Sequence, residues 1–146
     1  MPNTTLRTAI EAIEAHILDD LPDLELLQSD PLSSPLTSPQ QRGATGFFVR
    51  RELTRNLGET RNQDSARVED VIIVELQSRI APKSQIAVRG ALYDKEGEVI
   101  NRVSELGFNR RWNLTLLDAR DQVRGGEWLA VLIRFSLKRY LEVGAG

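Results

Sequence analysis

The sequence contains no cysteine, and this absence narrows the chemistry open to the protein. A chain without cysteine has no disulfide, no thiolate nucleophile and no zinc–thiolate site. Its one histidine, His16, has neither a second histidine nor a cysteine to complete a ligand shell. We therefore expect His16 to be an ordinary helix-surface residue, and we expect no metal.

Long hydrophobic runs are also missing. No apolar stretch reaches the roughly 18–20 residues that a membrane-spanning helix requires. Residues 1–20 mix Arg7 with four acids and interrupt every apolar stretch with polar positions, which is not the pattern of a signal peptide. We expect no contact with a membrane.

The common catalytic and nucleotide-binding motifs are absent as well. The sequence has no Gly-x-Ser-x-Gly elbow, no Gly-x-x-x-x-Gly-Lys-Ser/Thr loop and no Gly-x-Gly-x-x-Gly fingerprint. Asp94, Glu96 and Glu98 lack the further ligands that a calcium loop needs at fixed offsets. The sequence therefore predicts neither an enzyme nor a cofactor.

What the sequence does contain is typical of a globular protein with unevenly placed charge. Its 146 residues are 40% hydrophobic and 27% charged, and this length predicts one domain over residues 1–146. Residues 1–30 hold one base and seven acids, whereas the remainder holds 18 bases and 14 acids. Sixteen of the 19 bases are arginine, which makes bidentate contacts with carboxylates or phosphates.

The first thirty residues contain an amphipathic helix. Apolar residues recur every three or four positions from Leu6 to Leu21, and Pro22 ends the pattern. If the helix contacts a neighbouring subunit, its acids are the candidates: Glu11, Glu14, Asp19 and Asp20.

A proline- and serine-rich connection follows, at about residues 28–46. Three prolines and the lack of an apolar period exclude a helix or an inner strand there. Connections this long are usually functional or ordered by a partner, although a flexible linker remains the alternative. The apolar candidates for docking on a partner are Leu32, Leu36, Phe47 and Phe48.

Residues 46–54 and 68–80 alternate as strands do, and the polar segment between them predicts a β-hairpin with a long exposed tip. Its arginines could bind phosphate, but five acids on the hairpin dilute the positive field and favour protein contacts. The candidate interface arginines are Arg50, Arg51, Arg55, Arg61 and Arg67.

The remaining residues predict a second helical region over 82–106, which Gly90 and Gly97 would kink or divide, with Gly107 ending it. Strands over 112–119 and 127–143 follow, the last after Gly125-Gly126. The expected fold is α+β, in the order α-β-β-α-β-β. It has a four-stranded, mostly antiparallel sheet with two main helices on one face. The other face mixes Arg134 with Trp128, Ala130 and Leu132, which predicts burial between subunits.

This layout resembles that of the tail terminator (tail completion) proteins of tailed bacteriophages, and of the related neck and head–tail joining proteins. The resemblance rests on an acidic first helix, a proline-rich connection and an arginine-rich hairpin. It also rests on a second helix preceded by Ala81-Pro82-Lys83 and on the C-terminal strand Gly-Gly-Glu-Trp-Leu-Ala-Val-Leu-Ile-Arg-Phe-Ser-Leu-Lys-Arg-Tyr.

The resemblance implies a virion protein that assembles in the host cytoplasm into a ring, which is expected to be six-fold. Such a ring caps the tail tube, stops its polymerisation and joins the tail to the neck or connector protein, with DNA passing through its lumen. Two other functions stay open from the sequence: a small cytoplasmic RNA- or protein-binding domain, and a connector or baseplate component.

Overall fold

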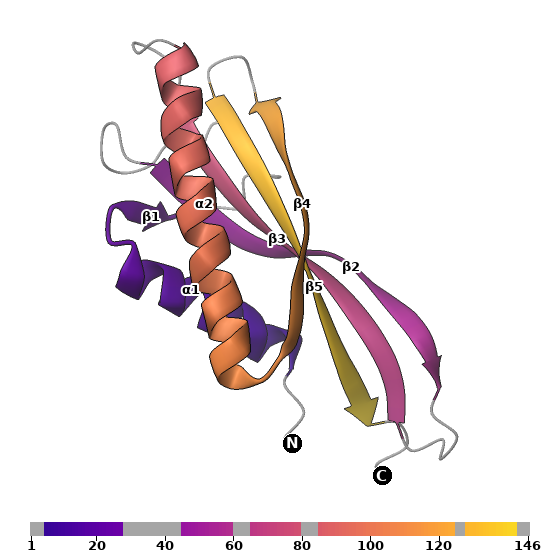
Figure 1. Cartoon of the computed structure of the whole chain (residues 1–146). Coiled ribbons are helices and arrows are strands. Elements are labelled where there is room, and N and C mark those ends of the chain that lie inside the picture. The colour runs from indigo at the N-terminus through magenta and orange to yellow at the C-terminus, as the bar shows by residue number, and fades with distance from the viewer. Residues whose placement is uncertain (1–4, 28–44, 60–64, 80–84, 125–127, 143–146) are drawn as a thin grey trace.

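The computed structural model describes residues 5–27, 45–59, 65–79, 85–124 and 128–142 (Figure 1). They form two helices and five strands, so the α+β class is confirmed, and the expectation of four strands was wrong by one. In chain order the elements are α1 (Leu6–Asp20), β1 (Leu24–Leu26), β2 (Thr45–Glu59), β3 (Ser65–Arg79), α2 (Gln85–Arg110), β4 (Asn113–Arg124) and β5 (Trp128–Glu142).

The strands make one mixed sheet in the order β1-β2-β3-β5-β4. β1 pairs with β2 in parallel, and the other neighbours pair antiparallel. β1 was not predicted because three residues are too few to show a period. Its pairing extends to Leu27, whose backbone N–H donates to Phe47 O at 2.9 Å.

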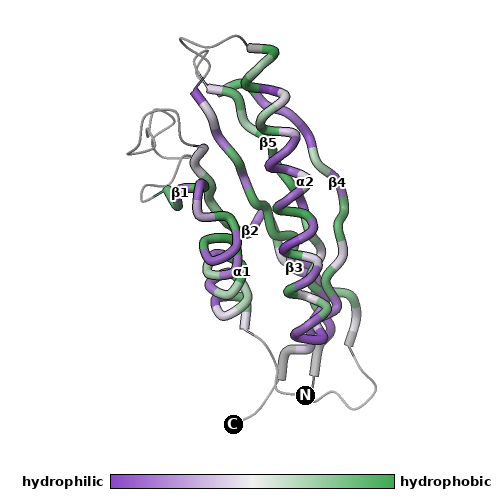
Figure 2. The backbone as a smooth tube through the Cα atoms, turned by 60° about the vertical axis from the view of Figure 1, so that its left-hand side comes forward, coloured by the Kyte–Doolittle hydropathy of each residue, from purple (hydrophilic) through white to green (hydrophobic). Residues whose placement is uncertain are grey.

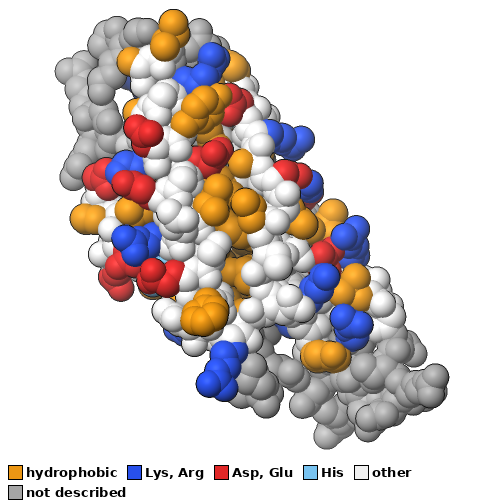
Figure 3. Space-filling model, viewed as in Figure 1, with side chains coloured by type: hydrophobic (Ala, Val, Ile, Leu, Met, Phe, Trp, Pro, Cys, Tyr) orange, Lys and Arg blue, Asp and Glu red, His pale blue; other side chains and the backbone are white. Residues whose placement is uncertain are grey.

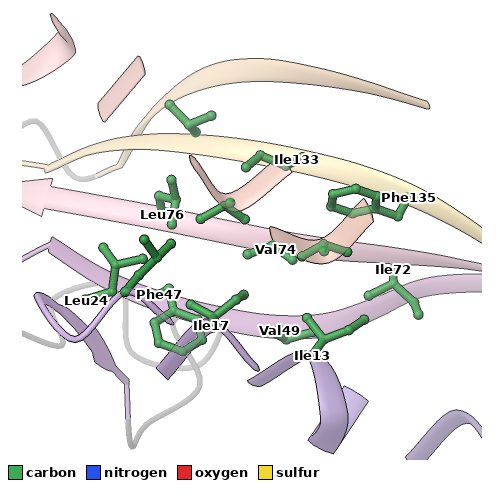
Figure 4. Packing of buried hydrophobic residues seen from close by; sticks show 14 of the residues in the cluster. Ile13, Ile17, Leu24, Phe47, Val49, Ile72, Val74, Leu76, Ile133 and Phe135 are labelled. Atoms are coloured by element: carbon green, nitrogen blue, oxygen red, sulfur yellow. The ribbon is translucent and has the colours of Figure 1, made fainter. Parts of the chain in front are cut away.

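Both helices lie on the same side of the sheet, as expected (Figure 1). α1 packs on β1, β2 and α2, while α2 crosses β3, β5 and β4. Hydropathy alternates along both helices (Figure 2). Ile13 and Ile17 of α1 enter the main core beside Phe47 and Val49 of β2 (Figure 4).

The predicted long tip of the hairpin was wrong, because the strands continue through most of it. β2 and β3 pair as far as Glu59 and Ala66, with register shifts between Arg51 and Leu53 and between Asn56 and Gly58. Gly58 has a φ of 117° and donates its N–H to Asn56 Oδ1 at 2.8 Å. With β5 these strands run past the helices as an arm, at the lower right of Figure 1. The residues of the arm are mostly polar, so its sequence lacks the alternation of hydrophobic and polar residues from which strands are predicted.

Helix α2 is one continuous helix of 26 residues, so the expected interruption is also wrong. Gly107 does not end it. The chain turns instead at Arg111, which has a φ of 57°. The N–H groups of Arg111 and Trp112 donate to Phe108 O at 3.2 Å and Gly107 O at 2.9 Å, the hydrogen bonds of a Schellman cap.

Gly107 has a packing role instead. A Cβ built on it would lie 3.0 Å from the Cβ of Leu114, so its small size lets α2 approach β4 closely. Neither of the two described helices is long and apolar enough to cross a membrane.

Candidate assembly interface

The arginines of the hairpin divide into paired and unpaired side chains. Arg55 donates from Nε to the carboxylate of Glu69, and the Nη2 of Arg50 lies 3.9 Å from Glu75 Oε1. Arg67 places its guanidinium 6.0 Å from the centre of the Tyr140 ring. Arg51 is exposed and forms no ion pair with any residue that the structure describes. Arg61 lies outside the described residues.

The partners of these arginines are acids buried in the sheet. Glu69 is 3% exposed and accepts a hydrogen bond from Ser136 Oγ of β5 as well as from Arg55. The bond from Ser136, and after it the contacts with Arg55, hold the pKa of Glu69 below its ordinary value, although burial opposes them. A buried carboxylate is tolerated where donors surround it in this way.

Two further buried acids repeat the arrangement. Asp70 accepts hydrogen bonds from Thr54 of β2 and from Arg139 of β5, so it joins three strands. Glu75 is fully buried on the face of the sheet away from the helices and accepts a hydrogen bond from Gln77 Nε2. Arg50, Arg55 and Arg139 therefore have a structural role, because their guanidinium groups neutralise carboxylates buried in the sheet.

A network of charged side chains spans the sheet on the face away from the helices. Arg134 of β5 donates from Nε and Nη2 to Asp118 of β4 at 2.7 and 2.5 Å, and from Nη1 to Glu52 of β2 at 3.0 Å. Its hydrogen bonds lower the pKa of Asp118 and raise its own pKa. The three side chains tie the two outer long strands to a central one.

The apolar candidates differ in accessibility. Phe47 is fully buried in the main core, so its side chain is not available to a partner in this fold, because it packs beneath α1. Phe48 points to the other side of β2 and is half-buried. Leu32 and Leu36 lie outside the described residues, with most of the proline-rich connection.

The acidic candidates lie along α1. Glu11 pairs with Arg7 at 2.9 Å, and Asp19 is exposed without an ion pair among the described side chains. Burial, and then the neighbouring Glu11, raise the pKa of Glu14. Figure 3 shows acidic side chains gathered beside the helices and basic ones along the strands to the right, in line with the uneven charge of the sequence.

The predicted half-apolar outer face of the sheet is not an exposed patch. Trp128, Ala130 and Leu132 are each at most 3% exposed within the single chain, and Ala130 and Leu132 form a second small core with Ile73. Their burial means that these three side chains form no exposed apolar patch for a neighbouring subunit to cover, so the expectation is wrong for the described residues of this face.

The edges of the sheet are more accessible than its faces. β1 pairs with only the first three of the 15 residues of β2. The outer side of β4 has no strand partner within the described part of the chain. Large apolar side chains are exposed along both edges: Leu53 and Leu57 on β2, and Leu116, Leu117 and Val123 on β4.

One cluster of metal-ligating side chains was missed by the sequence analysis. His16 and Asp20 lie one turn apart on α1 and meet Glu105 of α2. His16 and Glu105 are 89 positions apart in the sequence, and nothing in the sequence pattern indicates that they are in contact.

Comparison with known proteins does not place the chain in a family. The sequence matches no protein-family model and no curated protein.

Proposed function

We propose that this chain is a structural virion protein, a tail terminator whose copies close into a ring that caps the tail tube and joins the tail to the neck. The order of helices and strands supports the resemblance to that class, and the geometry of the sheet supports a ring. A ring of identical copies requires two different surfaces on each copy that fit one another.

The observation that carries the proposal is the pair of open sheet edges. Beyond the three residues paired with β1, β2 has twelve residues, 48–59, whose side away from β3 has no strand partner in the described structure. β4 is also 12 residues long. Unpaired backbone N–H and C=O groups along such edges are ready to pair with another chain.

The strand directions suit pairing between copies. Antiparallel pairing alternates across β2, β3, β5 and β4, so β2 and β4 run in opposite directions. Rotation about an axis that preserves strand direction would place β4 of one copy antiparallel to β2 of the next. Each added copy would then continue the same sheet, and the rotation would close it into a ring.

The arm gives such a ring two different axial sides. β2, β3 and β5 run beyond the helices at one end of the molecule only (Figure 1). One side of the ring would therefore present the arm and the other would not. A terminator needs this asymmetry, because it meets the tail tube on one side and the neck or connector on the other, with DNA in the lumen.

The alternative function, RNA binding by a small α+β domain, has less support from the geometry. Guanidinium groups already paired with carboxylates contribute little positive field for phosphate. Arg50, Arg55, Arg134 and Arg139 are paired in this way.

Cysteine cross-linking tests the ring, and the cysteine-free sequence provides a clean background. Leu53 of β2 and Arg120 of β4 lie on the same face of the sheet, through their register with Val71 and Leu132. The double variant Leu53→Cys/Arg120→Cys, treated with a short bis-maleimide, should give a ladder on a denaturing gel whose largest band reports the ring number.

Each single-cysteine variant is the matched control, because one cysteine per chain links at most two chains. Light scattering of the untreated protein should show the same ring mass. A monomer at every concentration that gives no ladder, and that retards an RNA band with steep dependence on salt, would replace the terminator by the RNA-binding domain.

A further inference from the structure

We propose that His16, Asp20 and Glu105 form a divalent transition-metal site, suited first to Zn²⁺, that clamps helix α1 to helix α2. His16 Nε2 lies 3.2 Å from Asp20 Oδ2 and 3.7 Å from Glu105 Oε1. The three ligand atoms all lie within 4.8 Å of one another. The inference is independent of ring formation, because all three residues belong to the helical layer of one chain.

The spacing agrees with a tetrahedral ion. Zn²⁺ binds histidine nitrogen and carboxylate oxygen at about 2.0–2.1 Å, so two ligand atoms of a tetrahedral site are about 3.3–3.4 Å apart. The distances from His16 Nε2 to the two carboxylates lie on either side of that value. Small side-chain rotations would bring all three atoms to bonding distance of one ion.

A second observation points to a cation between these groups. His16 Nε2 is buried and has no hydrogen-bond partner within the described structure, although two carboxylates face it. A divalent ion placed between the nitrogen and the two carboxylates would bind all three groups. An imidazole nitrogen among the ligands favours zinc and related metals over Mg²⁺ or Ca²⁺, which prefer oxygen.

Arg102 supports the site from outside. Its Nη1 lies 3.4 Å from Glu105 Oε2, which leaves Oε1 of that carboxylate for the ion. Its Nε lies 4.0 Å from Asp20 Oδ2. Such outer contacts orient metal-binding carboxylates. Asp20 and Glu105 are both partly exposed, so an ion and the water that completes its coordination have a path to the site.

Helix spacing explains how the sequence builds this cluster. Residues four apart lie on the same face of a helix, so His16 and Asp20 project together at the end of α1. α2 packs against α1 and contributes Glu105, five residues before the helix ends at Arg110. A bound ion would therefore link the C-terminal part of α1 to the C-terminal part of α2.

The test uses the full chain, which is freed of metal with a chelator and kept at about pH 8, where an ordinary histidine is neutral. Isothermal titration with ZnCl₂ should give one saturable site per chain, and thermal unfolding should shift to higher temperature as free zinc increases. Co²⁺ should give the visible absorption of a tetrahedral complex, whereas MgCl₂ should give no shift.

Variants locate the ion. His16→Gln and Asp20→Asn should each weaken zinc binding more than about tenfold, since loss of outer partners alone costs that much. Asp19→Asn, the exposed neighbour, is the matched control and should bind as wild type does. Zinc binding that survives His16→Gln, or that is absent from the wild type, overturns the site. A particle mass that rises in step with zinc binding places the ion between chains and overturns the clamp.

Discussion

Arg134 and Asp118 form a bidentate ion pair between β5 and β4, with donor–acceptor distances of 2.7 and 2.5 Å. The fork of the guanidinium matches the two carboxylate oxygens, and a third donor reaches Glu52 across the sheet. This pair fixes β4, an edge strand, to the centre of the sheet. It therefore supports the edge on which the proposed ring depends.

Arg134→Met should lower the free energy of unfolding by about 1 kcal/mol, the upper range for a partly exposed pair, because the methionine keeps the apolar stem and removes the charge. Urea denaturation at pH 7 measures the difference. Arg51→Met is the matched control, because Arg51 has no ion pair with a described residue, and it should change stability by less than about 0.5 kcal/mol.

The same pair predicts a dependence on pH. Arg134 lowers the pKa of Asp118 in the folded state, so the unfolded chain takes up a proton first as the pH falls. The contribution is complete above the unfolded pKa of an aspartate, about 3.9, and is lost as the pH falls through the lower folded value. The stability difference between wild type and Arg134→Met should thus persist at pH 5–7 and shrink below about pH 4. A difference that grows on acidification would contradict the assignment.

Ser136→Ala should destabilise the protein by about 1–3 kcal/mol, because it removes a donor from the buried carboxylate of Glu69. The pKa of Glu69 should rise at the same time, since the bond from Ser136 is the largest cause of its lowered value. Chemical denaturation at several pH values measures both effects. Ser104→Ala, on the exposed side of α2, should be nearly neutral. Equal losses of stability in the two variants would contradict the role of Ser136 as a donor that stabilises the Glu69 carboxylate.

How much of this fold the sequence could predict depended on burial. The three- and four-residue spacing around Ile13 and Ile17 predicted α1 closely, because one face of that helix enters the core. β5 was predicted over nearly its whole length, as residues 127–143 against the observed Trp128–Glu142, for the same reason. The outer ends of β2 and β3, residues 55–59 and 65–67, were missed, because residues such as Arg55 and Arg67 lie on an arm without a hydrophobic face.

The contacts between distant charged residues were beyond sequence reasoning altogether. Arg55 was a candidate for contact with a neighbour because it was judged alone, but its partner Glu69 lies in the next strand, buried. Glu105 was not considered beside His16, because only the packing of α1 on α2 brings them together. The composition of the sequence gives the number of arginines, but it does not indicate which carboxylates they pair with.

Substitution by alanine should raise the stability of the protein at the glycines of α2 and lower it at Gly46 of β2. A Cβ at Gly90 or Gly97 would meet nothing within 4 Å, so either substitution should stabilise the protein by about 0.5–1 kcal/mol through helix propensity. A Cβ at Gly46 would lie 2.6 Å from Leu27 Cδ2, so Gly46→Ala should cost about 1–3 kcal/mol by overpacking. Thermal unfolding of the three variants compares them, and a loss of stability at Gly97 would mean that α2 is interrupted there after all.

Arg111→Gly should stabilise the end of α2. Arg111 adopts a φ of 57°, which costs an ordinary residue roughly 1 kcal/mol or more and glycine almost nothing. Glycine also loses more chain entropy on folding, so the net gain should be about 0.5 kcal/mol. Arg110→Gly is the contrasting variant. It weakens the last helical position and removes a guanidinium 5.7 Å from the Trp112 ring centre, so it should destabilise. Denaturant midpoints of the two variants on either side of wild type would confirm the Schellman cap.

Arg51→Glu and Arg55→Glu should separate assembly from folding. Arg51 is exposed on the open part of β2 and has no ion pair with a described residue, so its reversal should leave the midpoint of thermal unfolding near wild type. If that edge meets a neighbouring copy, the same reversal should shift the ring toward monomer in light scattering. Arg55→Glu should instead reduce stability by about 1–3 kcal/mol, because it removes a donor from the buried carboxylate of Glu69 and places a second carboxylate beside it, although Ser136 still donates to Glu69. Normal assembly of Arg51→Glu at all concentrations would show that this part of β2 is not the contact between copies.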